Sequence, residues 1–263
     1  MNLATVIATY SRRMRLRLEN GEEVDARIKG KRTKPVCGDR VEVEPIENEV
    51  DWLITRIARR RNELTRPNMR GQVEVLAANL DYLVIVAAAE PKPDWFIVDR
   101  YLCAAELMGI DACVVFNKSD LGVSSIRYEL DTYFDIGYDV VACSALSGEG
   151  MDNVRTLLST HCSIIVGQSG VGKSSIINNL LGGEVQRTSG ISDKSREGRH
   201  TTVNSTMVSL PGGGAIIDSP GVRDYAPALE SSTMHRRVFA KFTTPRRSVA
   251  LPIAGTCANP GAQ

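Results

Sequence analysis

The chain has 263 residues, of which 24% are charged and 43% are hydrophobic, and its formal net charge is +1. This is an ordinary globular composition, and at roughly 100 to 200 residues per domain the length allows about two domains. No apolar run approaches the ~18 residues of a membrane span and the first residues resemble no signal peptide, so we expect a cytoplasmic protein without membrane contact. Six cysteines without a C-x-x-C pair predict no disulfide framework.

The near-zero net charge conceals an uneven distribution of charge. Residues 1–75 carry 16 Lys and Arg against 12 Asp and Glu, whereas the remaining 188 residues carry 16 against 19. The basic residues of the first part gather at positions 12–17, 29–34 and 56–61. Clustered cations form either a solvated face or a nucleic-acid surface, and charge alone does not decide between these two interpretations.

Short alternating strands are typical of the first 70 residues. Met14–Leu18 leads into the turn Asn20-Gly21 and residues 24–28 return, which predicts a hairpin. Residues 41–44 and Trp52–Ile57 add further short strands. About five strands in roughly 65 residues predict a small barrel of the oligonucleotide-binding (OB) type.

After residue 67 the pattern changes to apolar runs that alternate with helical segments. Such alternation predicts an α/β fold with a mostly parallel sheet covered on both faces. We therefore expect an OB-type barrel over 1–70, an α/β domain over 71–230 and a separate tail over 231–263. The predicted strands are 80–88, 112–116, 140–143, 163–166 and 215–217, and the predicted helices are 95–107, 125–134, 151–158 and 173–181.

The strongest motif matches the phosphate-binding pattern G-x-x-x-x-G-K-[ST] and lies between a predicted strand and a predicted helix. Its glycines let the backbone N–H groups surround phosphates at a helix N-terminus. Lys173 is expected to reach the β and γ phosphates, and the Ser174 hydroxyl to ligate Mg²⁺. The nucleotide-binding residues predicted here are Gly167, Gln168, Ser169, Gly170, Val171, Gly172, Lys173, Ser174 and Ser175.

Two further motifs indicate guanine. Asn117-Lys118-Ser119-Asp120 follows a predicted strand and resembles the NKxD motif of GTPases, in which the carboxylate accepts hydrogen bonds from guanine N1–H and N2–H₂. Ser144-Ala145 resembles the SA element, whose backbone N–H at Ala145 would meet guanine O6. Because adenine lacks this donor pair, the motifs favour GTP over the alternative of a P-loop ATPase or kinase.

The third group of motifs concerns the γ-phosphate. Asp218-Ser-Pro-Gly221 resembles DxxG, in which Asp218 would hold Mg²⁺ through water and the Gly221 N–H would sense the γ-phosphate. The polar segment 198–202 resembles the first switch, and we favour Thr202 as the Mg²⁺ ligand over Thr201. The guanine motifs precede the phosphate loop in this chain, which is the reverse of most GTPases. The sequence therefore predicts a circularly permuted GTPase.

A barrel followed by permuted GTPase motifs resembles the RsgA family of small-ribosomal-subunit biogenesis GTPases over residues 1 to about 230. The resemblance implies an enzyme that binds GTP or GDP with Mg²⁺ and hydrolyses GTP under stimulation by the 30S subunit, with the barrel on 16S rRNA. Nothing in the sequence indicates more than a monomer. It also implies His200 as the catalytic residue, because Val222 stands where Ras-like enzymes carry a water-orienting glutamine. The alternative is a nucleotide-independent RNA-binding protein with a vestigial GTPase site.

The tail departs from this family, which carries a Zn²⁺ site of three cysteines and one histidine. Beyond Cys162 the chain has only Cys257, and its last histidine is His235, so we predict no zinc ligands here. When residues 237–262 are translated back into codons and read in a shifted frame, the genetic code permits the pattern C-x₄-C-x-H-x₅-C. This pattern supplies the three cysteines and one histidine of the family's zinc site. We therefore hypothesise a frameshift between about 231 and 237, which the nucleotide sequence would test.

Overall fold

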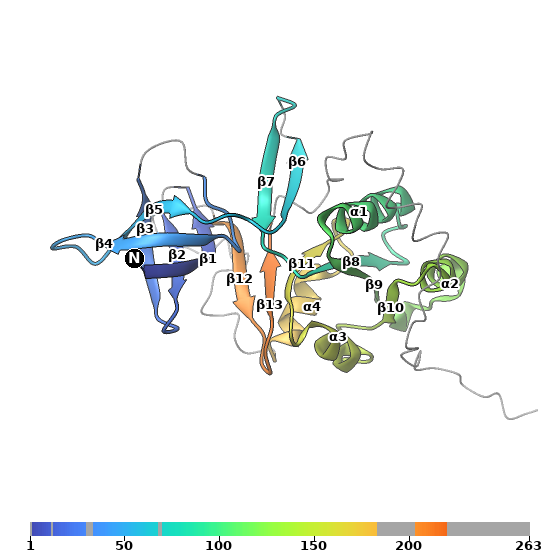
Figure 1. The fold of residues 1–263 in the computed structure, drawn as a ribbon. Coiled ribbons are helices and arrows are strands. Elements are labelled where there is room, and N and C mark those ends of the chain that lie inside the picture. The colour runs from blue at the N-terminus through green and yellow to red at the C-terminus, as the bar shows by residue number, and fades with distance from the viewer. Residues whose placement is uncertain (1, 12, 30–33, 68–69, 183–202, 220–263) are drawn as a thin grey trace, which may run out of the picture.

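The computed structural model describes residues 2–11, 13–29, 34–67, 70–182 and 203–219. These residues form a β-barrel, a projecting hairpin and a sheet flanked by helices (Figure 1). The predicted tail and first switch lie outside the described residues. No helix in the described part of the chain is long and apolar enough to cross a membrane.

The N-terminal barrel closes through five strands, as predicted. Its strands pair in the order β1-β2-β3-β5-β4, and β4 pairs back with β1. Val6, Leu16 and Ile54 are among the buried side chains that fill its interior. Alternation places apolar residues inward and charged residues outward, which is the pattern of a small OB-type barrel. The strands are β1 (Asn2–Tyr10), β2 (Met14–Leu18), β3 (Glu23–Ile28), β4 (Arg40–Pro45) and β5 (Trp52–Ile57).

A second hairpin, which sequence reasoning did not predict, connects the barrel to the α/β region. It consists of β6 (Glu63–Pro67) and β7 (Val73–Ala78), which pair with each other in a separate two-stranded sheet. The boundary predicted between 70 and 71 falls within the turn of this hairpin. The hairpin carries the chain away from the barrel and back toward β8 (Figure 1).

The α/β region follows the predicted alternation. Its strands lie in the order β10-β9-β8-β11-β13-β12, and all pair in parallel except β12, which is antiparallel to β13. The strands are β8 (Tyr82–Ala88), β9 (Asp111–Asn117), β10 (Asp139–Ala142), β11 (Cys162–Val166), β12 (Val203–Ser209) and β13 (Ala215–Asp218). The helices are α1 (Trp95–Met108), α2 (Arg127–Ile136), α3 (Met151–Leu158) and α4 (Lys173–Leu180), with short 3₁₀ turns at Ser119–Leu121 and Ser124–Ile126.

Helices cover both faces of this sheet because its strands are apolar on both sides. Along the fully buried strand β8, Leu83 and Ile85 belong to the core beneath α1 and α2. Val84 and Val86 belong to the core beneath α3 and α4. Successive strand residues point to opposite faces, so one continuous apolar run supplies two cores.

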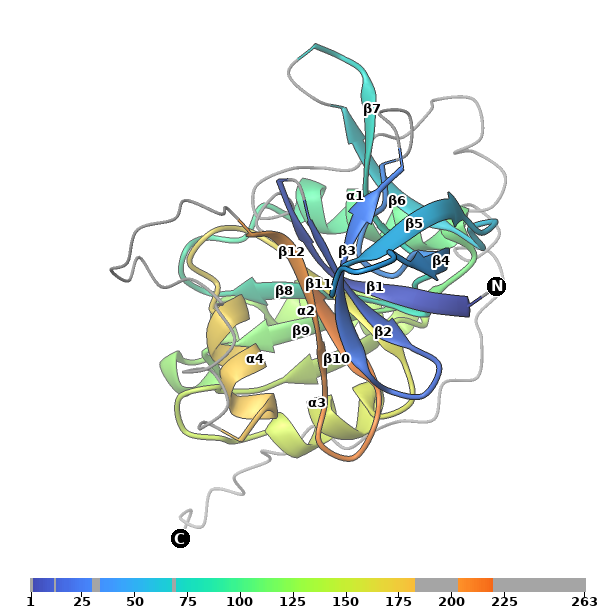
Figure 2. The same cartoon turned by 90° about the vertical axis from the view of Figure 1, so that its left-hand side faces the viewer.

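The barrel and the α/β sheet are joined edge to edge. Strand β1 pairs antiparallel with β12, with Ala8 opposite Thr206 and Thr9 opposite Ser205. Figure 2 shows β12 lying beside β1, and the strands of the barrel and of the α/β region together form one 11-stranded sheet. Ile7 of β1 and Met207 of β12 contribute to the same core cluster as β8. The junction is thus both hydrogen-bonded and apolar.

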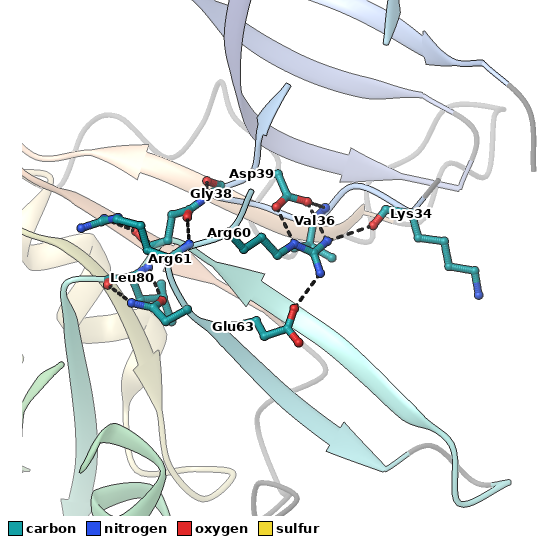
Figure 3. A network of polar contacts seen from close by, with 10 residues as sticks. Lys34, Val36, Gly38, Asp39, Arg60, Arg61, Glu63 and Leu80 are labelled. Atoms are coloured by element: carbon teal, nitrogen blue, oxygen red, sulfur yellow. Dashed lines mark hydrogen bonds and ion pairs between the residues drawn. The ribbon is translucent and has the colours of Figure 1, made fainter. Parts of the chain in front are cut away.

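A buried ion pair locks the chain between barrel and hairpin (Figure 3). The Arg60 guanidinium donates to both carboxylate oxygens of Asp39, at 2.7 and 2.9 Å, and also to Glu63 at 2.9 Å. Asp39 is fully buried and accepts a further bond from the Val36 N–H at 2.9 Å. Hydrogen bonding to Asp39 raises the pKa of Arg60, so the guanidinium group stays charged.

Asp39→Ala should lower the free energy of unfolding by about 2 to 3 kcal/mol, because it leaves Arg60 without its buried acceptor. Arg60 keeps 21% of its side-chain exposure, so the loss should be smaller than for a fully buried pair. Urea unfolding measures the change. Glu42→Ala is the control, since its partner Arg56 is 72% exposed and the pair should be worth less than about 1 kcal/mol. Equal losses in the two variants would contradict the assignment.

Candidate functional site: a phosphate loop beside a guanine-type motif

The predicted motifs meet at one edge of the α/β sheet. Asn117 ends β9, Ser144 follows β10, Gly167 follows β11 and Asp218 ends β13. These strands are parallel, so their carboxyl ends lie together. This edge is where ligands bind in open α/β sheets, because the loops there can open into a crevice.

Asn117 connects three of the motifs through its side chain. Its amide nitrogen donates to the Val171 carbonyl in the phosphate loop at 2.9 Å, and its amide oxygen accepts from the Ala145 N–H at 3.0 Å. The residue is 2% exposed, so both bonds are shielded from water. The contact of the Ala145 N–H with guanine O6 stays a prediction. In this structure the same N–H donates to Asn117, so it would have to share its hydrogen between the two acceptors or exchange one for the other.

Glycine is required at the end of the phosphate loop. Gly172 caps α4 with φ +93°, in the left-handed region that disfavours other residues. A Cβ built there would overlap the Asn117 amide nitrogen. The close approach of loop backbone to Asn117 therefore depends on the missing side chain.

Lys173 lies folded against its own loop. It is 8% exposed, and its ammonium group donates to the carbonyls of Gly167 at 2.6 Å and Gln168 at 2.5 Å. A buried cation held at this point adds to the positive potential of the α4 N-terminus. Ser174 is half-buried, whereas Ser169, Gly170 and Ser175 are exposed.

The NKSD motif adopts a strained turn. Lys118 has φ +62°, which is uncommon outside glycine, and its ammonium group donates to the Glu90 carbonyl at 2.8 Å. The turn places the Asp120 carboxylate in solvent at the sheet edge. The Ser119 hydroxyl is buried and has no hydrogen-bond partner among the described residues.

Residues 90–94 also contribute to this edge, although sequence reasoning did not select them. Gln168 accepts a bond from the Asp94 N–H at 3.0 Å, and Pro91 is the neighbour nearest to a Cβ built at Gly170. Asp94 also caps α1 by accepting from Phe96 and Ile97. The sequence offered one sign of their role: this loop directly follows the carboxyl end of a buried parallel strand, which is where ligand-binding loops lie.

Asp218 lies buried at the end of β13, beside a polar contact that was not predicted. The Ser205 hydroxyl of β12 donates to the Ser219 hydroxyl at 2.9 Å, and both residues are buried. This bond ties the DSPG segment to the strand that pairs with the barrel. The other predicted residues of this group, Thr202, His200 and Gly221, lie outside the described residues.

Fold and site together define the class: a P-loop α/β domain in which the guanine-type motifs precede the phosphate loop, joined to an N-terminal OB-type barrel. The model of the RsgA GTPase family matches residues 57–227. This chain belongs to that family.

Curated relatives agree with this assignment. The small ribosomal subunit biogenesis GTPase RsgA of Azotobacter vinelandii is 39% identical over 229 residues, which cover 84% of this chain and 66% of the relative. Its counterpart from Ectopseudomonas mendocina is 42% identical over 194 residues, covering 72% of this chain and 56% of the relative. The chain thus spans between about half and two thirds of the length of these relatives.

Solved structures share the fold. The crystal structure of YjeQ from Thermotoga maritima is 26% identical with a TM-score of 0.64, and the match covers 84% of this chain and 75% of that one. YloQ, described as a circularly permuted GTPase, has a TM-score of 0.60 at 22% identity, covering 88% of this chain and 74% of that one. The circular permutation predicted from the order of the motifs therefore agrees with the fold that this chain shares with these structures.

Gly172→Ala should weaken GDP binding about tenfold or more, because the new methyl group displaces Asn117 from the loop. Gly182→Ala is the matched control: Gly182 also has a positive φ, +78°, but nothing lies within 4 Å of a built Cβ. Both variants should lose about 1 kcal/mol of stability through the backbone alone. Calorimetric GDP titration separates them, and equal GDP affinities would contradict the role given to Gly172.

Proposed function

We propose that this chain is a GTP-hydrolysing switch that acts in late maturation of the 30S ribosomal subunit, in the cytoplasm and as a monomer. The observation that carries the proposal is the Asn117 side chain, which holds the NKSD, SA and phosphate-loop segments against one another. The relatives named above supply the biological context. The working units proposed are the barrel over 1–70 and the GTPase domain over 71–230.

Guanine recognition is assigned to Asp120. Its carboxylate lies at the sheet edge and can accept two hydrogen bonds from guanine N1–H and N2–H₂, which adenine does not offer. Lys118 is anchored to Glu90 through its ammonium group, so its aliphatic chain is held beside the same turn. The Asp120 carboxylate and the anchored Lys118 side chain therefore favour GTP over ATP as the nucleotide.

Phosphate binding is assigned to the loop 167–175. Its backbone wraps around the start of α4, where Lys173 is already buried and oriented. The Ser174 hydroxyl and the buried Asp218 carboxylate are the oxygen donors that Mg²⁺ prefers, with Thr202 as a third candidate. When bound, Mg²⁺ neutralises charge on the β and γ phosphates. Gly221 is the proposed γ-phosphate sensor.

No zinc-dependent step is proposed. The described residues contain no group of three or more candidate ligands, and their cysteines are free. Burial raises the pKa of the Cys143 thiol to about 12 and that of Cys162 to about 11, which disfavours the thiolate that zinc requires. Cys257 lies outside the described residues.

Contact with 16S rRNA is assigned to the barrel. Ion pairs on the barrel surface reduce the number of arginines that are available for such contact. Arg13, Arg15, Arg17 and Arg27 all form ion pairs with carboxylates on the barrel surface. Paired arginines present less net charge to a polyanion than their number suggests. The RNA-binding surface should therefore be smaller than the three basic clusters.

The function is tested by measuring GTP and ATP hydrolysis by the full chain with and without 30S subunits. We expect slow GTP turnover alone, a strong increase with 30S subunits, and no ATP turnover under either condition. Hydrolysis of ATP only would identify a P-loop ATPase or kinase. RNA binding without any nucleotide turnover would identify the vestigial alternative.

His200→Ala should abolish the 30S-stimulated turnover and leave GTP affinity nearly unchanged, because His200 is proposed to orient the attacking water and not to hold the nucleotide. His161→Ala serves as the matched control, since His161 lies in the turn before β11, at the opposite end of that strand from the phosphate loop. Stimulated rates equal to those of the unmodified chain would remove His200 from the mechanism.

A further inference from the structure

A cavity of about 580 Å³ lies where the barrel meets the α/β sheet. Residues of β1, β2 and β4 form its barrel side, and the first residues of β11 and β13 together with Met207 of β12 form the other side. Arg17, Arg40, Arg59 and Arg61 line it, and no carboxylate of the described residues does. It is therefore a basic cavity built by both halves of the molecule.

This cavity is separate from the nucleotide edge. Cys162 and Ala215 line it, and these residues begin β11 and β13. The phosphate loop follows the other end of β11, and Asp218 ends β13. At about 3.3 Å per residue, the four residues of β13 place Ala215 roughly 10 Å from Asp218 along the strand. The two sites lie at opposite ends of the same strands.

The pairing of the arginines singles out this cavity. The described arginines between residues 13 and 66 form ion pairs with carboxylates in all cases but two. The exceptions are Arg40 and Arg59, which have no hydrogen bond or ion pair from the side chain to any described residue, and both line the cavity. Elsewhere on the barrel, carboxylates neutralise the described guanidinium groups. The two guanidinium groups in the cavity that lack a carboxylate partner can bind an anion.

The other two arginines are held in place. Arg61 donates to Asp81 and to the Asn79 carbonyl, both at 2.9 Å. Arg17 donates to Glu23 and to the Ser209 hydroxyl, also at 2.9 Å. Ile7 and Met207 supply an apolar wall, which lowers the local dielectric and strengthens any charge interaction beside it. The cavity thus combines two arginines held by ion pairs, two exposed arginines without a carboxylate partner, and a buried apolar wall.

We propose that this cavity is a second anion site that binds a phosphate group. The planar fork of arginine matches phosphate oxygens in a bidentate way, so Arg40 and Arg59 are the residues assigned to the ligand. The phosphate can belong to a free nucleotide or pyrophosphate, or to an RNA backbone, because the recognising chemistry is the same. An occupied site would place the phosphate on the barrel side of the junction, next to the first residues of β11 and β13.

The test uses the full chain saturated with GDP and Mg²⁺, so that the phosphate loop is blocked. Inorganic pyrophosphate and a single-stranded RNA of eight uridines are titrated separately at low salt. Arg40→Gln with Arg59→Gln should weaken binding of at least one of the two probes by about tenfold or more. The matched control is Arg13→Gln with Arg56→Gln, which removes the same charge from exposed barrel positions outside the cavity and should change binding by less than about threefold.

Each outcome either supports the phosphate site in the cavity or overturns it. Selective loss of pyrophosphate binding supports a free phosphate ligand, and selective loss of RNA binding supports a backbone phosphate. Equal binding in the unmodified chain and the cavity variant, or equal losses in the cavity and control variants, would overturn the proposal. Arg40→Lys with Arg59→Lys, which keeps charge without the fork, should bind at an intermediate level. GDP affinity is measured separately, so a failure of the GTPase assignment remains distinguishable.

Discussion

The antiparallel pairing of β1 with β12 is the interaction on which the arrangement of the whole molecule depends. These backbone hydrogen bonds turn a barrel and an α/β sheet into one continuous sheet, and Ile7 and Met207 place both sides of the junction in one apolar core. Strand β12 also pairs with β13, which ends at Asp218. A displacement at the nucleotide edge therefore has a direct covalent and hydrogen-bonded route to the barrel.

Side-chain bonds reinforce both ends of this route. At the nucleotide edge, Asn117 holds the phosphate loop to the SA segment, and the Ser205–Ser219 bond ties the DSPG segment to β12. At the junction, the Asp39–Arg60 pair fixes the barrel loop to the segment that leads into the β6–β7 hairpin. Buried polar contacts of this kind are costly when left unpaired, so they favour one arrangement of the parts over others.

Charge on the barrel is organised by the fold and not by composition. Strand pairing places a carboxylate opposite three of the barrel arginines: Asp25 opposite Arg15, Glu23 opposite Arg17 and Glu42 opposite Arg56. Cross-strand neighbours lie about 5 Å apart, which is within reach of an ion pair. In the cavity at the junction, Arg40 and Arg59 have no such carboxylate opposite them, and no acidic residue lines the cavity among those that the structure describes.

The local motifs and the apolar periodicity were determined by the sequence. The phosphate loop, NKSD and DSPG could be placed after strands because strand and turn signals act over a few residues, and the buried runs predicted β8, β9 and β11 closely. Strand β12 and the β6–β7 hairpin were missed, since β12 is rich in serine and threonine and gives little apolar contrast. Long-range pairing decided the rest: which strand β1 joins, which carboxylate neutralises each arginine, and that Asn117 reaches Val171 across 54 positions. Such contacts depend on the summed packing of distant segments, which short-range sequence patterns do not encode.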